Sequence, residues 1–296
     1  MRITLRDGVR LFVDVDGASL RPTGPTMTEV PSLVLLHGGP GFDHSPFKAF
    51  FGPLAGRVQL VYYDHRGMGR SDASDPSNWN LATWADDLAD LLAQLGITRP
   101  ILLGQSFGGF VALEYAVTRS AGLAGLVLSS TGARHVPGDC YEAFARLGGP
   151  IARAACEAFF DRPCDETFTR YCADAMGHYN TMPQDPLIRR RQLTATAVLH
   201  HFWATELRSF DLRPRLPRIT CPTLVVAGEE DPITPPQRSR EIAAALDPAR
   251  TRLCLLPGAG HGAYRDTPDD FEEALTAFLD AVADDEGASR PAIAAR

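Results

Sequence analysis

Short, continuous apolar runs alternate along this chain with segments whose apolar residues recur at helical spacing. The first clear run is Leu33-Val34-Leu35-Leu36, which is bounded by Pro31 and Gly38 and is typical of a strand buried on both faces. The first clear helix is Leu81–Leu95, and Gly96 provides its C-terminal stop. Strands that alternate with helices predict an α/β fold, in which helices cover both faces of a mostly parallel sheet.

The alternation continues through most of the chain, and two stretches depart from it. An Asp7-Gly8 turn joins two predicted N-terminal strands, and residues 21–31, rich in Pro, Thr and Gly, are interpreted as a linker. The tail at 284–296 is small, polar and Ala-rich, and we expect it to be disordered. The predicted strands are 3–5, 11–15, 33–36, 58–63, 101–103, 123–128, 223–227 and 252–256, and the further predicted helices are 107–118, 235–246 and 268–282.

One long segment, 134–213, contains no convincing buried strand. Its Ala, Phe, Tyr and Cys residues have helical spacing, and prolines at 150, 163, 183 and 186 break it. We interpret it as a helical cap inserted above the C-terminal edge of the sheet, where open α/β folds bind ligands. The predicted organisation is therefore a core at 1–133 and 214–283 with the cap between the two parts.

Charge and composition exclude several classes of function. The 296 residues carry a formal net charge of −7, which favours neither nucleic acid nor an anionic membrane as a partner. The N-terminus lacks the apolar stretch of a secretory signal, and no apolar run approaches a membrane span, so we expect a cytoplasmic protein. Six cysteines fit no zinc spacing; we expect reduced thiols, no metal and no cofactor. The oligomeric state cannot be inferred.

The strongest chemical signal is Gly104-Gln105-Ser106-Phe107-Gly108-Gly109, which lies between a predicted strand and a predicted helix. This G-x-S-x-G pattern places a serine on a turn so tight that side chains at the flanking glycines would collide. The N-terminus of the following helix directs free N–H groups at the same point, where negative charge would develop. Ser106 is therefore the predicted nucleophile.

A serine hydroxyl needs a base, and the base needs an acid that orients it. His261 lies in the Gly-rich stretch Pro257-Gly258-Ala259-Gly260-His261-Gly262, directly after the last predicted strand, and is the best placed of the eight histidines. Asp231 follows the strand at 223–227, and Pro232 fixes its turn. The residues occur in the order Ser–Asp–His, which is the order of α/β-hydrolases.

An acyl-transfer site also needs two donors for the oxyanion. The backbone N–H of Phe107 is the first candidate, because it directly follows the serine. The second candidate is the N–H of Gly39 in the loop His37-Gly38-Gly39-Pro40-Gly41, which follows the strand at 33–36. We interpret His37 as a brace for this loop rather than as a proton carrier.

Five motifs together resemble the α/β-hydrolase superfamily, and the first of them resembles its proline iminopeptidase branch. They are HGGPG at 37–41, DHRGMGRS at 64–71, GQSFGG at 104–109, GEEDPITPP at 228–236 and GAGHG at 258–262. Within the second motif, Asp64, Arg66 and Ser71 are interpreted as structural. The resemblance implies acids that hold a substrate amine, for which Glu206 is the main candidate and Glu230 a second, with Trp203 lining a proline-sized pocket.

The sequence thus predicts a serine hydrolase that acts by acyl transfer without a metal or cofactor. The resemblance implies an aminopeptidase that releases an N-terminal residue, proline first, from a small-molecule or short-peptide substrate. A small-molecule carboxylesterase or lactonase is the alternative. A ligand-binding protein on a hydrolase scaffold, without turnover, is a third possibility.

Overall fold

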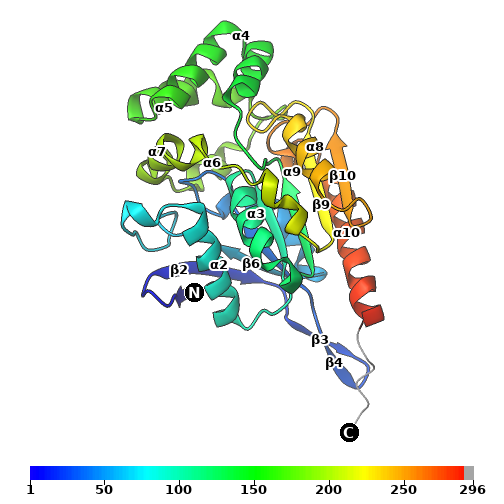
Figure 1. The fold of residues 1–296 in the computed structure, drawn as a ribbon. Helices are drawn as coiled ribbons and strands as arrows, with labels where there is room; N and C mark the ends of the chain where they lie inside the picture. Colours follow the sequence, from blue (N-terminus) through cyan, green and yellow to red (C-terminus); the bar gives the residue numbers. More distant parts are fainter. Residues whose placement is uncertain (290–296) are drawn as a thin grey trace.

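A computed structural model describes residues 1–289 of the chain, with side chains up to residue 285. Within this range the main sheet has eight strands in the order β1-β2-β6-β5-β7-β8-β9-β10 (Figure 1). The strands from β6 to β10 in this order are parallel, whereas β1 and β2 pair antiparallel at one edge. Their bounds are β1 Arg2–Thr4, β2 Arg10–Asp16, β5 Ser32–Leu36, β6 Gln59–Tyr63, β7 Ile101–Gln105, β8 Gly125–Ser129, β9 Thr223–Gly228 and β10 Thr251–Leu256. The prediction of an α/β-hydrolase fold with a mostly parallel sheet is confirmed.

In the parallel strands other than the edge strand β10, alternate residues pack into separate hydrophobic clusters on the two faces of the sheet. Val34 and Leu36 of β5 face the cluster formed with α2 and α3, while Leu33 and Leu35 face the cluster formed with α1, α9 and α10. Both faces are therefore buried, which explains why the sequence shows unbroken apolar runs rather than alternation. The core helices are α1 Lys48–Phe51, α2 Leu81–Leu95, α3 Phe107–Arg119, α8 Pro236–Ala245, α9 Ala263–Asp266 and α10 Pro268–Ser289.

The cap lies between β8 and β9 and stands above one end of the sheet (Figure 1). An isolated bridge between Arg134 and Asp211 joins its two ends, close to the predicted bounds of 134 and 213. At Gly149, φ is 71°, and together with Pro150 this residue divides the first cap helix, as the proline break predicts. The cap helices are α4 Pro137–Asp161, α5 Asp165–Asp174, α6 Pro186–Arg191 and α7 Thr196–Ala204.

Two predictions at the ends of the fold were wrong. The proposed linker at 21–31 contains a hairpin of β3 (Leu20–Thr23) and β4 (Thr26–Glu29), because Gly24 adopts a φ of 59° and closes a tight turn. Residues 284–289 of the proposed disordered tail continue α10, because the helix is already formed over the preceding residues and no proline interrupts it. The rest of that prediction, 290–296, lies outside the described residues.

Among residues 1–289, no helix combines the length and the apolar character that crossing a membrane requires.

Candidate active site

Ser106 occupies a strained turn between β7 and α3. Its φ of 55° and ψ of −119° are unusual for a residue with a side chain. A Cβ atom at Gly104 would lie 2.4 Å from the Gly108 carbonyl oxygen, and one at Gly108 would lie 2.0 Å from the Leu36 carbonyl oxygen. Only glycine fits at these two positions, so the flanking glycines of the motif are explained by close backbone approach.

Two hydrogen bonds hold the strained residue in place. The Ser106 N–H donates to the Ser129 carbonyl at 2.9 Å, and the Thr131 hydroxyl donates to the Ser106 carbonyl at 2.8 Å. Both partners come from β8 or the residues directly after it. The neighbouring strand therefore supports the backbone conformation that exposes the Ser106 hydroxyl to the pocket.

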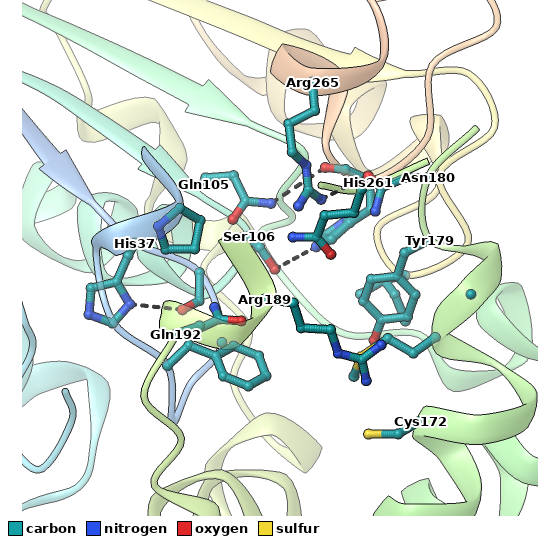
Figure 2. Close-up of a pocket in the computed structure, with 18 of the residues that line it drawn as sticks. His37, Gln105, Ser106, Cys172, Tyr179, Asn180, Arg189, Gln192, His261 and Arg265 are labelled. Atoms are coloured by element: carbon teal, nitrogen blue, oxygen red, sulfur yellow. Dashed lines mark hydrogen bonds between the residues drawn. The ribbon is translucent and has the colours of Figure 1, made fainter. Parts of the chain in front are cut away.

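The structure brings the three residues of the predicted triad together. His261, in the loop between β10 and α9, has its Nε2 atom 2.9 Å from Ser106 Oγ. Its Nδ1 atom lies 2.9 Å from Asp231 Oδ2, after the end of β9. Figure 2 shows the contact between His261 and Ser106. With Nδ1–H donating to Asp231, Nε2 can accept the proton of the serine hydroxyl, which is the geometry required to activate a serine nucleophile.

Asp231 is buried, and donors surround its carboxylate. The backbone N–H groups of Ile233 and Thr234 donate to Oδ1 at 2.8 and 3.0 Å, and the Thr234 hydroxyl donates to Oδ2 at 2.8 Å. Burial by itself would raise the pKa of Asp231, but the charge of His261 and these hydrogen bonds outweigh it and lower the pKa. The carboxylate is therefore ionised near neutral pH and can stabilise a protonated His261.

The two predicted oxyanion donors belong to segments that meet the pocket. Gly39 lines the same pocket as Ser106, and Phe107 directly follows Ser106 as the first residue of α3, so its N–H has no acceptor within the helix. Neither N–H donates to another residue within 1–289. Both are thus available to an oxygen atom at the serine, as oxyanion stabilisation requires.

His37 braces the oxyanion loop, in agreement with its predicted role. Its Nδ1 atom donates to the Gly38 carbonyl at 2.8 Å, and its Nε2 atom accepts from the His65 N–H at 3.2 Å. The ring is buried, and burial lowers the pKa of His37. A neutral ring with a hydrogen bond at each nitrogen holds the loop and is not free to carry protons.

The turn at 64–71 is structural as well. Arg66 pairs with Asp87 through two hydrogen bonds, at 2.7 and 2.5 Å, and its Nη2 atom also lies 2.7 Å from Asp7. The Ser71 hydroxyl donates to the Asp64 carbonyl, and the Phe12 N–H donates to that hydroxyl at 2.9 Å. These contacts join the turn to α2 and to β2 rather than to the pocket.

The cap is fixed to the histidine loop by contacts that the sequence did not reveal. The His261 N–H donates to the Tyr179 carbonyl at 2.6 Å, and the Tyr179 ring meets the His261 ring edge-on at a centroid distance of 5.4 Å. Asn180 Oδ1 accepts from the Gly262 N–H at 2.9 Å. A Cβ atom at Gly260 would lie 2.2 Å from the Tyr179 carbonyl oxygen, so a glycine there permits the contact.

Asp266 and Gln105 complete this junction. Asp266 accepts from the Gly260 N–H at 2.8 Å and from the Thr181 N–H at 3.0 Å, so one carboxylate joins the core loop to the cap. The Gln105 amide donates to the His261 carbonyl at 3.4 Å. Only the glycines around His261 could have signalled such close packing.

A pocket of about 790 Å³ opens over Ser106 between the core loops and the cap (Figure 2). This volume is in the range that small-molecule sites occupy. Trp203 lines the pocket, as predicted, together with other cap aromatics. The aromatic lining residues from the cap are Phe159, Phe168, Tyr171, Tyr179 and Trp203.

The two acids expected to hold a substrate amine lie elsewhere. Glu206 Oε2 accepts the Leu81 N–H at 2.9 Å and so caps the N-terminus of α2. Glu230 pairs at the surface with Arg146 at 2.5 Å. Neither belongs to the pocket lining, so the predicted amine-binding role is corrected for both. A side chain that follows an aromatic helix can turn to the core as readily as to the pocket, and sequence alone does not decide this.

The chain belongs to the α/β-hydrolase fold family, whose family model matches residues 31–268. It is 32% identical over 287 residues to a proline iminopeptidase of Levilactobacillus brevis, covering 90% of this chain and 94% of that protein. It is 31% identical over 260 residues to the putative carbamate hydrolase RutD of Pseudomonas savastanoi pv. phaseolicola, covering 84% and 94%. A thermophilic esterase from Thermogutta terrifontis superposes with a TM-score of 0.67 at 27% identity, covering 95% and 98%. Hydrolases of several substrate classes are thus similar to it.

Proposed function

We propose that this protein is a serine hydrolase that cleaves small carboxylic esters or lactones by acyl transfer. The observation that carries the proposal is the pair of 2.9 Å contacts that link Ser106 Oγ, His261 and Asp231 at the base of the pocket. The N–H groups of Gly39, which lines the same pocket, and of Phe107, which follows the serine, support it, because neither donates to another described residue.

In the proposed reaction, Ser106 Oγ attacks the carbonyl carbon while His261 Nε2 takes the hydroxyl proton. Asp231 stabilises the imidazolium, and the two N–H groups bind the oxyanion of the tetrahedral intermediate. The C–O bond to the leaving alcohol then breaks, and His261 returns its proton to that oxygen. Water, deprotonated by His261, attacks the acyl-enzyme; the carboxylic acid leaves and Ser106 recovers its proton.

The charge of the pocket favours an ester or lactone over the N-terminal residue of a peptide. The acid among the lining residues is Asp43, and its carboxylate is buried and paired with Arg70 at 2.6 Å. Within residues 1–289, no other carboxylate lines the pocket, whereas Arg189 and Arg265 do. An ammonium group at Ser106 would therefore face positive charge without a compensating acid, which argues against the aminopeptidase interpretation.

A substrate panel with an active-site variant tests the proposal. We expect turnover of 4-nitrophenyl acetate and a simple lactone to exceed that of proline 4-nitroanilide. Ser106→Ala should lower ester turnover by about 10⁵-fold, because the nucleophile is lost while the fold remains. A fluorophosphonate should label Ser106 in the native protein and in the control Ser209→Ala, which changes an exposed serine outside the pocket lining.

Other outcomes would point elsewhere. Faster turnover of the proline substrate would restore the aminopeptidase interpretation. Labelling of a different residue, or an active Ser106→Ala protein, would refute the nucleophile. Absence of turnover on the whole panel would favour a ligand-binding protein on this scaffold.

A further inference from the structure

Arg189 lines the pocket as an arginine without a protein partner. It lies near the end of α6 and is exposed, and its side chain extends into the pocket (Figure 2). Within residues 1–289 it forms no ion pair and no side-chain hydrogen bond, whereas Arg191 on the same helix bonds the Leu187 carbonyl. Gln192, directly after the helix, lines the same wall. This wall therefore presents unpaired donors to whatever occupies the pocket.

Arg265 brings a second positive charge to the other side of the site. Its Nη2 atom donates to Asn180 Oδ1 at 2.9 Å, but it has no acidic partner in the described chain. Its Nε atom is buried and lacks an acceptor there. A Cβ atom at Gly262 would lie 2.3 Å from Arg265 Nη2, so the guanidinium lies directly against the residue that follows His261.

Two guanidinium groups line this pocket, and neither has an acid partner within the described residues. Other arginines near the site have acids: Arg70 pairs with Asp43, and Arg66 pairs with Asp87. Arg265 is half-buried, where a charge is normally compensated, whereas Arg189 is exposed at the pocket wall. An arginine fork matches a carboxylate in shape and hydrogen-bonding pattern, so an anion bound in the pocket would find two guanidinium groups that have no acid partner.

We propose that the substrate carries a free carboxylate in addition to its ester or lactone bond, and that Arg189 binds this carboxylate while Arg265 adds positive charge beside Ser106. The inference deepens the proposed hydrolase function and rests on it. The substrate class is then a half-ester of a dicarboxylic acid, an ester of a hydroxy acid, or a lactone that bears a carboxylate. Neutral esters are poorer substrates, because they offer neither guanidinium group a negative charge.

The central experiment compares matched anionic and neutral esters in a pH-stat assay. Monoethyl glutarate and ethyl pentanoate have similar length and differ in charge, while acetoxyacetate places the carboxylate on the alcohol side. We expect kcat/KM for at least one anionic ester to exceed the neutral value by about tenfold or more, the gain typical of a charge-assisted hydrogen bond. The anionic substrate that shows the preference identifies the side of the scissile bond that carries the carboxylate.

Variants assign the preference to Arg189. Arg189→Gln should reduce the ratio of anionic to neutral kcat/KM by about tenfold, and Arg189→Glu should reduce it further, because the charge is reversed. Arg190→Gln is the matched control: it removes the next arginine of the same helix, which is exposed and outside the pocket lining, and should leave the ratio unchanged. Added salt should weaken the preference in the native protein.

The outcomes separate this inference from the proposed function. Turnover of neutral esters through Ser106 with no anionic preference, or a preference that Arg189→Gln leaves intact, would overturn the inference alone. If no ester is cleaved, the proposed function fails, and calorimetric titration with glutarate then decides the inference. Binding that is lost in Arg189→Gln and kept in Arg190→Gln supports an anion site, and no binding to the native protein refutes it.

Discussion

The two walls of the pocket are built in opposite ways. On the core side, Ser106, His261 and Asp231 bond one another, and Asp231 has three further donors from Ile233 and Thr234. On the cap side, Arg189 projects from a short helix without a protein partner. Side chains that bond one another fix one geometry and one chemistry, whereas a side chain without a protein partner can take its partner from the ligand. We propose on this basis that the core performs the reaction and that the cap selects the substrate.

The largest effect is expected for Asp231→Asn, which tests the catalytic role proposed for the core wall. We expect kcat on 4-nitrophenyl acetate to fall by about 10⁴-fold, because an amide that donates to Nδ1 favours the wrong tautomer and leaves Nε2 unable to accept from Ser106. The fold should persist, since the asparagine oxygen can still accept from Ile233 and Thr234. Steady-state kinetics with a thermal denaturation curve measure both.

The neighbouring Glu230→Gln is the matched control for this change. Glu230 precedes Asp231 but pairs with Arg146 at the surface, so its loss should leave kcat unchanged. An equal loss of kcat in both variants would mean that Glu230 and Asp231 both support the reaction. A fully active Asp231→Asn protein would show that Asp231 does not take part in the reaction, and the role proposed for the core wall would fail.

The core could be predicted from the sequence because its geometry is imposed by the backbone. The turn at Ser106 admits only glycine at 104 and 108. This constraint produces a recognisable sequence motif, G-x-S-x-G, between a strand and a helix. Strands buried on both faces likewise leave continuous apolar runs. Fold class and the positions of Ser106, Asp231 and His261 therefore followed from local signals.

The cap could not be predicted in the same way, because its side chains depend on how short helices pack. Three consecutive arginines end α6, and Arg189 alone among them lines the pocket, which depends on the rotation of that helix. Glu206 contacts a residue 125 positions away. Neither side-chain orientation can be read from residue spacing or composition. The amine-binding role that the resemblance implied for Glu206 was therefore wrong.

A second test asks whether the core motif at 64–71 supports the fold, and it uses Asp64→Asn. Asp64 accepts from the His44 ring at 2.7 Å, from the His44 N–H at 2.9 Å and from the Arg70 N–H at 2.7 Å. Burial by itself would raise the pKa of Asp64, but the hydrogen bonds from His44 and Arg70 outweigh it and lower the pKa to about 2. The variant should lose about 2 kcal/mol of unfolding free energy at pH 7.

The pH dependence follows from the direction of this shift. Because the folded pKa is lower than the unfolded one, ionised Asp64 stabilises the fold fully above about pH 5, and the contribution disappears as the pH falls towards 2. Urea unfolding at pH 7, 5 and 3.5 should show the two proteins converging in acid. Asp72→Asn, which changes a more exposed acid bonded to Arg10, should cost less. A loss that stays constant down to pH 3.5 would contradict this account.

The smallest expected effect concerns Glu206, the acid that the resemblance assigned to a substrate amine. In the structure it caps α2 through the Leu81 N–H, while Asn80 caps the same helix through the Thr83 N–H at 2.9 Å. Glu206→Ala should therefore lower the unfolding free energy by about 1 kcal/mol, similar to Asn80→Ala, since each leaves one helical donor without its partner.

The kinetic result decides between the two roles of Glu206. Glu206→Gln keeps an oxygen that can accept from Leu81 and removes only the charge, so its stability should fall by a few tenths of a kcal/mol at most. If Glu206 held a substrate amine, Glu206→Gln would lower kcat/KM about ten- to a hundredfold more on proline 4-nitroanilide than on 4-nitrophenyl acetate. We expect the ratio of kcat/KM for the two substrates to stay unchanged, because the carboxylate faces the start of α2 and not the pocket. A selective loss on the proline substrate would show that the cap rearranges when it binds a ligand, and the assignment of substrate choice to Arg189 would then have to be shared with an acid.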